Sequence, residues 1–534
     1  MAAASDIEET STEKLLQRLT PEERAYVDKL NANPDLDHDK VLALLKAHIQ
    51  TAIDIELSTI PIYLFTYYAL KRNAYSGDRI RESDLFANKA GGIIMSVAVE
   101  EMLHMSLSCN LLYSLGTAPL VYKRAPASYP TPLPHHQQGV EIPLTKLTFD
   151  QLLNFLKIEK PEEKGGMPEG NNWETIGQFY SYIRCLICSK YIQDADFTAG
   201  ARAHQIGTGN YSPNNIDTIY PAMAFDPWKP APSAANGTDP RPTWAAPNPS
   251  PRASAVAVYP DEVKVHDEAG GGPGHDALTQ VSNKWQALDA IETICEQGEG
   301  YLHDQDPQPT TGTDDEEESH YEKFLTLLAQ FPEYIGKTAS DLGLDTPPAL
   351  PAAVSPTIEP NVLAQVQYNF PDNPKRDKYP ADCHAYLDFC NGVFQYMLIL
   401  TETIFKFPSD PDPAKDPQKR FFNEGLHRSM IWVLDKWIQF MRTSEIKTGD
   451  YAGLNLAPTF EWIDLGSRAE AFGQLKTLGE AAIAAAGGPD SYGASIVATA
   501  ISLMDGDHPM HLPDVSALWS DDGTTTGATR GEKG

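Results

Sequence analysis

The sequence has little positive charge, few cysteines and no long apolar run, and each shortage excludes a class of protein. Its 534 residues include 42 Lys and Arg against 73 Asp and Glu, so the formal net charge is −31. Such an excess of negative charge argues against phosphate backbones and anionic membrane surfaces as binding partners. We therefore expect no nucleic-acid partner and no membrane partner.

Six cysteines are too few for a disulfide scaffold and suit a reducing compartment. Cys185 and Cys188 form a CxxC, but no second ligand pair is spaced to complete a zinc site, so we expect both to be structural. The lack of any uncharged apolar run of about 18 residues predicts no membrane-spanning helix. The acidic, polar beginning lacks the basic and apolar regions of a signal peptide, which favours a cytoplasmic protein.

What the chain does contain is helical hydrophobic pattern. Nearly unbroken patterns run over 40–71 and 82–116, and two more follow over 278–300 and 316–331. Asp37 is placed to cap the first pattern, and Gly116 is placed to end the second. The predicted fold class is mainly α, with four helices forming a bundle.

The composition changes along the chain, which predicts three parts. A long Pro-rich and Gly-rich interruption separates the second helix from the third, although it carries two helical patterns of its own. A final helical block follows a Pro-rich linkage. The predicted parts are an exposed N-terminal arm at 1–36, the bundle at 37–335 with an insertion at about 117–278 (helices near 149–156 and 173–191), and a C-terminal helical region and tail at 336–534.

Glutamates and histidines recur in the four predicted bundle helices. A carboxylate buried among apolar residues in the middle of the first helix is costly unless it is paired or bound to a metal. A Glu and a His three residues apart project from the same side of a helix and can share one ion. The order Glu, Glu-x-x-His, Glu, Glu-x-x-His is the ligand set of di-iron carboxylate bundles of the ferritin-like kind. The candidate metal ligands are Glu56, Glu101, His104, Glu296, Glu317 and His320.

A Glu-x-x-His pair alone carries little weight, because chance placement produces such pairs in a chain with 14 histidines. A third pair, Glu424 and His427, lies in the C-terminal block, where we interpret it as surface or packing residues. The order and context of the other two pairs carry the prediction. The alternative is that Glu56 pairs with a Lys or Arg from elsewhere in the fold.

The ligand types indicate the metal and its chemistry. Carboxylates are hard, negatively charged ligands that can bridge two ions, and imidazoles complete the ligand set without adding charge. Two iron ions about 3.5–4 Å apart can bind dioxygen or peroxide and deliver oxidising equivalents. We therefore predict two iron ions, with manganese in place of iron, or haem in addition, left open at this point.

Other polar residues near these positions are expected to surround the ligands. Glu292 lies one helical turn before Glu296, so it is either an alternative ligand or a neighbour of the ligands. Glu100 points about 100° away from the residue that follows it, which favours a place behind the ligands or on the surface. Tyr63 and Tyr321 lie within two turns of ligands, where tyrosines are more often core residues than catalytic ones.

Four segments together resemble a known family: IELSTIPIYLFTYYAL, VAVEEMLHMSLSCNLL, AIETICEQGEG and ESHYEKF. They are similar to the ferritin-like domain of the iminophenyl-pyruvate dimer synthases, a family that includes the chromopyrrolate synthases of bisindole pigment pathways. The resemblance covers roughly 37–331, and weaker similarities extend toward residue 465. The stretch at 224–260 and the tail after 505 have no counterpart that we can place.

The resemblance implies a ferritin-like bundle, an iron-dependent oxidoreductase and small-molecule substrates, with the metal ligands carried over to the six residues named above. In the family, imines made by amino-acid oxidases are oxidatively coupled. We therefore expect an oxidoreductase that uses oxygen or peroxide on a small aromatic or amino-acid-derived molecule in specialised metabolism, with a homodimer as the assembly to consider. The alternatives are a di-iron oxygenase or desaturase on a hydrophobic substrate and, outside enzymes, an iron-binding protein or a scaffold that has lost its metal.

Overall fold

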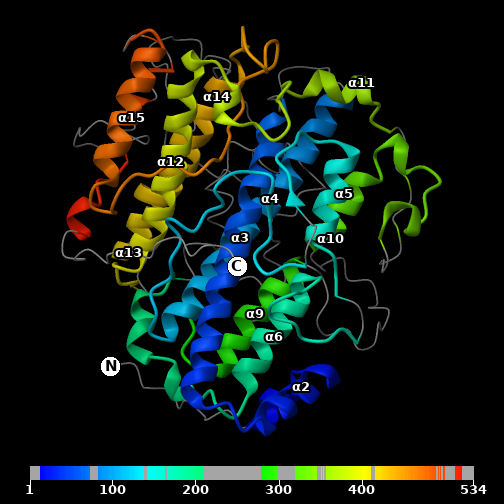
Figure 1. The fold of residues 1–534 in the computed structure, drawn as a ribbon, viewed down its shortest axis with the longest axis vertical. Helices are drawn as coiled ribbons and strands as arrows, with labels where there is room; N and C mark the ends of the chain where they lie inside the picture. Colours follow the sequence, from blue (N-terminus) through cyan, green and yellow to red (C-terminus); the bar gives the residue numbers. More distant parts are fainter. Residues whose placement is uncertain are drawn as a thin grey trace.

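The structure is a computed structural model, and α-helices form most of the regular structure that it describes (Figure 1), which confirms the predicted fold class. The described residues are 12–71, 82–137, 141–162, 165–207, 278–298, 319–344, 350, 353, 357–410, 415–488, 491, 493–494, 497–498 and 512–519. The bundle and the segments before it contain α1 (Thr12–Gln17), α2 (Pro21–Ala32), α3 (His38–Ala69), α4 (Glu82–Ser114), β1 (Thr131–Pro132), β2 (Glu141–Ile142), α5 (Phe149–Ile158), α6 (Ile176–Cys188), α9 (Lys284–Gly298) and α10 (His320–Leu328). The C-terminal region contains α11 (Pro360–Leu363), α12 (His384–Ile404), α13 (Pro417–Phe421), a π-helix (Phe422–Asp435), α14 (Lys436–Arg442) and α15 (Ala471–Ala485). Short 3-10 turns lie at Asp194–Asp196, Ala199–His204, Pro332–Tyr334, Ser340–Leu342, Ala364–Val366, Arg376–Lys378, Ala381–Cys383 and Ser516–Leu518.

Helices α3 and α4 are the longest elements described, with 32 and 33 residues, or about 48 Å each. The Asp37 carboxylate caps α3 by accepting a hydrogen bond from the Lys40 backbone N–H at 2.9 Å, as predicted. Gly116, with φ 76°, ends α4, and the Thr117 N–H reaches back to the Leu112 carbonyl. Both ends therefore follow from the sequence.

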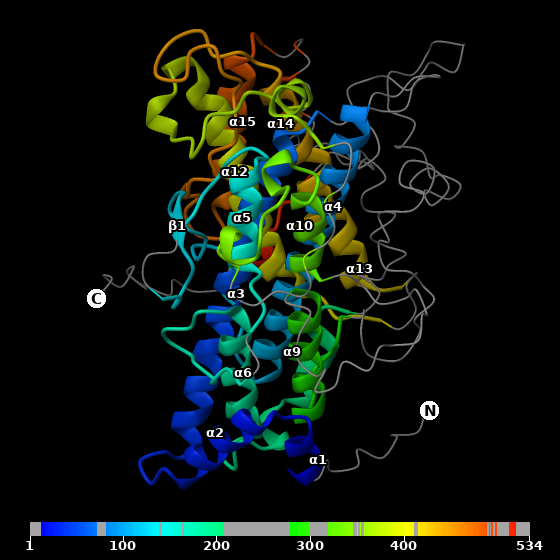
Figure 2. The same cartoon turned by 90° about the vertical axis from the view of Figure 1, so that its right-hand side faces the viewer.

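The remaining bundle helices, with 9 to 15 residues, are less than half as long and lie in two sets beside this pair (Figures 1 and 2). Helices α6 and α9 pack together along one half of α3 and α4, and α5 and α10 pack together along the other half. The two helices predicted within the insertion are thus α5 and α6, and they complete the bundle. In a four-helix bundle, two further long helices would lie beside α3 and α4. Here two short helices fill each of those two places.

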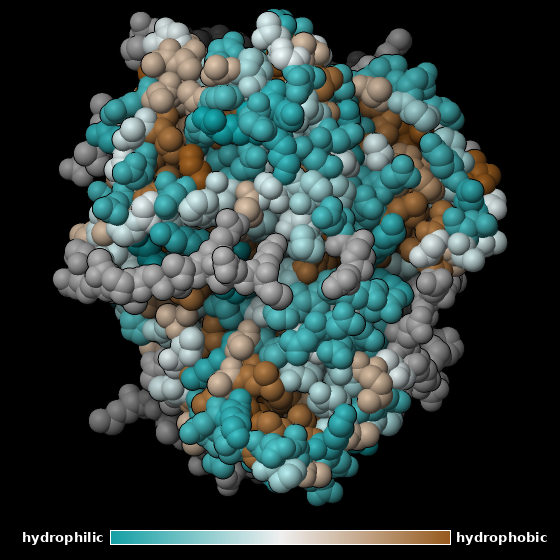
Figure 3. Space-filling model, viewed as in Figure 1, coloured by the Kyte–Doolittle hydropathy of each residue, from teal (hydrophilic) through white to brown (hydrophobic). Residues whose placement is uncertain are grey.

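Several elements cover the long pair. Residues 51–69 of α3 are all buried, because α4, the short helices and α14 surround that part of the helix. By length and composition, Lys89–Ser114 of α4 could cross a membrane, but the apolar stretch is wholly buried inside the protein, as in a core helix. The face of the protein in Figure 3 is mostly hydrophilic, with separate apolar areas.

The segment before the bundle is less exposed than the sequence suggests. Helices α1 and α2 pack on α6, and Glu23 in α2 is only 1% exposed. The buried guanidinium of Arg184 in α6 holds the Glu23 carboxylate at 2.9 Å. An ion pair that periodicity cannot reveal therefore ties the predicted arm to the bundle.

Candidate metal centre

Five buried residues meet where the two sets of short helices end. Glu56 comes from the middle of α3, and Glu101 and His104 come from the middle of α4. Glu159 follows the last residue of α5 as its C-cap, and His320 is the first residue of α10. None of the five is more than 3% exposed.

The end of α9 approaches the same place. A side chain added at Gly298, the last residue of α9, would come within 3.7 Å of Glu159 Oε2. The centre is therefore flanked by the ends of three short helices and the middles of two long ones. Only the long pair runs past it without interruption among the described helices.

The donor atoms fall into two groups that share one residue. Oxygen and nitrogen atoms of Glu56, Glu101 and His104 lie within 4.8 Å of one another, and those of Glu101, Glu159 and His320 do the same. The Glu101 Oε1 atom lies 3.6 Å from His104 Nδ1 and 3.2 Å from His320 Nδ1. A carboxylate shared in this way is placed to bridge two ions.

The Nε2 atom of each histidine contacts an oxygen atom of a neighbouring side chain. His104 Nε2 lies 3.0 Å from Gln297 Oε1, and His320 Nε2 lies 2.7 Å from Glu100 Oε2. Lys323 in turn holds Glu100 through contacts of 2.7 and 2.9 Å. Histidines that bind metals usually donate the other ring N–H to an oxygen acceptor of this kind. Both Nδ1 atoms are thereby left facing the carboxylates.

The three carboxylates follow a matching pattern. One oxygen of each accepts a hydrogen bond from a buried hydroxyl group, and the other oxygen is turned toward an imidazole nitrogen. The hydroxyl donors fix the orientation of the carboxylates without neutralising them. The hydroxyl–carboxylate pairs are Tyr180 with Glu56, Thr59 with Glu101 and Tyr63 with Glu159.

Burial and mutual repulsion shift the pKa values of these groups. Burial, followed by the charge of Glu101, raises the pKa of both Glu56 and Glu159. Burial also acts to raise the pKa of Glu101, but hydrogen bonds with the two histidines outweigh it and lower that pKa. Within the described residues no Lys or Arg forms an ion pair with these three carboxylates. Burial acts to lower the pKa of His320, but the charge of Glu159 and hydrogen bonds with Glu100 and Glu101 outweigh it and raise that pKa. Protons therefore balance these carboxylates, as bound cations would.

The donor set fits a pair of divalent cations. His320 Nδ1 is buried 3.2 Å from Glu101 Oε1 and 3.4 Å from Glu159 Oε2, yet it makes no hydrogen bond of acceptable geometry. A nitrogen aimed between two carboxylate oxygens is arranged as a metal ligand would be. Oxygen ligands with one imidazole for each group suit iron or manganese better than soft metals.

The structure brings together four of the six ligand candidates, Glu56, Glu101, His104 and His320. Glu296 is only partly buried and belongs to neither donor group among the described residues, because its neighbour Gln297 occupies the face of α9 that turns toward His104.

Glu317 lies outside the described residues. The fourth helix also begins later than the sequence predicts. Ser319 caps α10, with Glu322 completing a capping box, so the helix starts at His320 itself.

Glu159 is the functional residue that the periodic pattern missed. It lies in the predicted insertion and just beyond a helix, so no helical spacing links it to a histidine. The sequence does indicate the helix that positions Glu159. Thr148 is a good N-cap, and the apolar face of α5 leads directly into this glutamate. Tyr180, Thr59 and Gln297 were likewise not singled out.

The residues expected around the ligands divide into two kinds. Glu100 and Tyr63 contact His320 and Glu159, respectively. Tyr321 is buried but makes no hydrogen bond with the described ligand candidates. Glu292 instead pairs with Arg18 and Arg184 and belongs to neither donor group among the described residues. The side chains of Glu424 and His427 lie outside what the structure describes.

The CxxC cysteines are buried in α6, as expected for structural residues. Burial raises the pKa of Cys188 to about 11 and raises that of Cys185 further. Both thiols are therefore protonated at neutral pH, and neither belongs to a group of candidate metal ligands among the described residues.

A match to a protein-family model agrees with this architecture at the level of the domain. Residues 49–222 and 255–329 match the protein-family model described as Ferritin-like. A search among curated proteins finds none that matches. A solved structure of a ferritin-like protein from Caulobacter vibrioides is 17% identical, with 74% of this chain and 94% of that chain covered and a TM-score of 0.35. The narrower resemblance to the iminophenyl-pyruvate dimer synthases stays a prediction. The family match includes all five residues of the candidate centre, so the matched part of the chain is a ferritin-like domain.

Proposed function

We propose that the protein is an iron-dependent oxidoreductase with two iron ions at this centre. The observation that carries the proposal is the pair of donor groups that share Glu101. One ion would be held by Glu56, Glu101 and His104, and the other by Glu101, Glu159 and His320. Three carboxylates against two divalent cations leave a small net charge, which makes burial of the whole centre tolerable.

An iron pair supplies redox chemistry with dioxygen or peroxide when bound. The chain's own residues would hold the geometry. Glu101 would fix the spacing of the two positions, and Gln297 and Glu100 would keep the histidine rings turned toward it. The hydroxyl groups of Tyr180 and Tyr63 would keep one oxygen of Glu56 and of Glu159 directed to the metal side.

The substrate in this proposal is a small aromatic or amino-acid-derived molecule, and oxidative coupling of imines is the reaction that we favour. This part rests on the four segments that resemble the iminophenyl-pyruvate dimer synthases. Product analysis tests it directly. Two substrate units joined would support coupling, whereas one oxygen atom gained or two hydrogen atoms lost would support an oxygenase or a desaturase instead.

Metal content and the absorption spectrum of purified protein test the centre itself. We expect about two iron ions per chain in the wild type and loss of most bound iron in Glu101→Ala, because Glu101 belongs to both donor groups. Hundreds of ions per chain would indicate iron storage. Near-zero iron after loading, or manganese taken up in preference to iron, would contradict the proposal, and full retention in Glu101→Ala would contradict the ligand assignment.

A further inference from the structure

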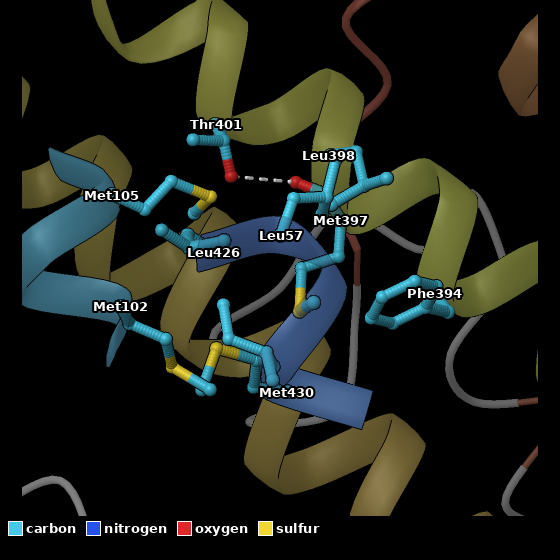
Figure 4. A pocket seen from close by; sticks show the side chains of 10 residues that line it. Leu57, Met102, Met105, Phe394, Met397, Leu398, Thr401, Leu426 and Met430 are labelled. Atoms are coloured by element: carbon cyan, nitrogen blue, oxygen red, sulfur yellow. Dashed lines mark hydrogen bonds between the residues drawn. The ribbon is translucent and has the colours of Figure 1, made fainter. Parts of the chain in front are cut away.

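Four methionines line one enclosed apolar pocket between the ferritin-like domain and the C-terminal helices (Figure 4). They are Met102 and Met105 of α4, Met397 of α12 and Met430 of the π-helix. The whole chain has 11 methionines, so more than a third of them lie around this space. The space has room for about one water molecule, so the gathering of four polarizable thioethers, and not the size of the space, is the unusual feature.

The pocket lies beside the candidate metal centre. Met102 directly follows Glu101 in α4, and Met105 directly follows His104. On α3, the pocket residue Leu57 directly follows Glu56. Adjacent residues on a helix differ by about 100° in direction. The thioethers therefore occupy the next face of the same helical turns that carry three ligand candidates.

Solvent exposure does not favour oxidation of the pocket methionines over that of surface methionines. Met102, Met105 and Met397 are at most 5% exposed, whereas Met167 on the surface is 53% exposed. An oxidant dissolved in bulk water should meet Met167 first. An oxidant that leaves the centre should instead meet Met102 and Met105 before it reaches solvent.

We infer that this methionine cluster intercepts hydrogen peroxide that escapes from the metal centre and is converted to methionine sulfoxide. The inference rests on the proposed function, because peroxide is the two-electron reduction product of dioxygen. In the step, one peroxide oxygen bonds to the thioether sulfur as the O–O bond breaks. The other oxygen leaves as water with both hydrogens. The sulfur loses two electrons and the peroxide gains them.

The location gives the modification a consequence. A sulfoxide is polar, and the pocket has almost no polar lining other than Thr401, whose hydroxyl group already donates to the Met397 carbonyl. Oxidation therefore loosens the contact between α4 and the C-terminal helices, and reduction of the sulfoxide restores it. The cluster thus protects the metal ligands at the expense of packing.

Peptide mapping by mass spectrometry tests the inference. Full-length protein is loaded with iron(II) in aerated buffer containing catalase, which removes peroxide from bulk solution. We expect several-fold more sulfoxide at Met102 and Met105 than at the exposed Met167 or at the buried Met441, which lies outside the pocket. In iron-free protein treated with hydrogen peroxide and no catalase, we expect Met167 to be oxidised first.

A variant in which all four pocket methionines are replaced by leucine keeps the volume and removes the sulfur. We expect it to fold and bind iron as the wild type does, but to gain several-fold more oxygen incorporation elsewhere in α3 and α4. Equal oxidation of Met441 and the pocket methionines, or an unchanged pattern in this variant, would overturn the inference. If iron binds and dioxygen is consumed while the pocket methionines stay unoxidised, this inference fails and the proposed function stands. If the wild type binds no iron, both fail.

Discussion

Two clusters of buried charge in the same bundle differ in where their positive charge comes from. In the Arg184 cluster, a guanidinium with no exposed surface holds Glu23 and Glu292, each at 2.9 Å. At the candidate metal centre, three carboxylates lie close together with two imidazoles and no Lys or Arg paired with them among the described residues. The positive charge of the first cluster is an arginine of the chain itself, whereas the side chains of the second are arranged so that they could bind cations from solution.

The comparison shows why a buried glutamate in a helix is ambiguous until its neighbours are known. Glu292 and Glu56 both lie within helices of the bundle, and each was a reasonable candidate for the centre. Burial of a charge requires a partner in both cases. In one case the partner is an arginine from a helix that is distant in sequence, and in the other it is a group of side chains that could hold a metal ion. The following predictions test this difference between a cluster paired with arginine and a cluster arranged for a metal, beginning with the largest expected effect.

Loss of the Arg184 guanidinium should lower the stability of the fold and leave iron binding at the candidate metal centre unchanged. Replacing Arg184 with Ala leaves Glu23 buried without its arginine partner, while Glu292 keeps Arg18, so we expect the free energy of unfolding to fall by about 3–5 kcal/mol. Urea denaturation of metal-free protein measures this change. Iron bound per folded chain should not change, and a loss of iron without a loss of stability would contradict this difference.

Loss of a candidate metal ligand should lower the iron content without lowering the stability of the metal-free protein. In Glu56→Gln the hydrogen bond from Tyr180 can persist, while a carboxylate with a burial-raised pKa is removed. We therefore expect metal-free protein to be as stable as the wild type or more stable, and iron content to fall to about one ion or less per chain. A stability loss comparable to that of Arg184→Ala would indicate an ion pair at this position instead of a metal ligand.

Glu159 and Glu296 distinguish the ligand set of the structure from the one that periodicity predicts. We expect Glu159→Gln to lose about half of the bound iron, because it contributes to one of the two donor groups. Glu296→Gln, a matched change on a partly exposed residue, should retain it. Elemental analysis of both variants decides the matter, and the reverse result would favour the sequence-based set.

A smaller effect is expected at Glu162, beside the Arg184 cluster. Burial, followed by the charges of Glu23 and Glu22, raises its pKa from 4.5 to about 8. The folded state therefore binds more protons than the unfolded state between these values, so this group lowers stability progressively as pH rises from about 4.5 to about 8. Thermal unfolding across this range should show a shallower decline in Tm for Glu162→Gln. An identical pH dependence in both proteins would show that this carboxyl titrates normally.

Much of the fold and part of the centre were accessible from sequence, for identifiable reasons. Helix periodicity located α3 and α4, and spacing within one helix placed Glu101 and His104 on one side of α4. Glu159 was not accessible, because it lies beyond the end of α5 and meets His320 only through packing of segments far apart in the chain. The start of the fourth helix differs for a local reason, since the capping box at Ser319 starts α10 four residues later than the apolar pattern implies, and Glu317 lies outside the described residues.

The unbroken course of α3 and α4 past the centre has a consequence for how such a chain can change. These two helices set the spacing of Glu56, Glu101 and His104 by helical geometry alone, whatever connects the shorter helices around them. The connections between α6 and α9, and between α9 and α10, can therefore lengthen or shorten without displacing that half of the ligand set. Related chains should differ most in these two connections, and new substrate preferences could arise there while the ligands on the long pair keep their places.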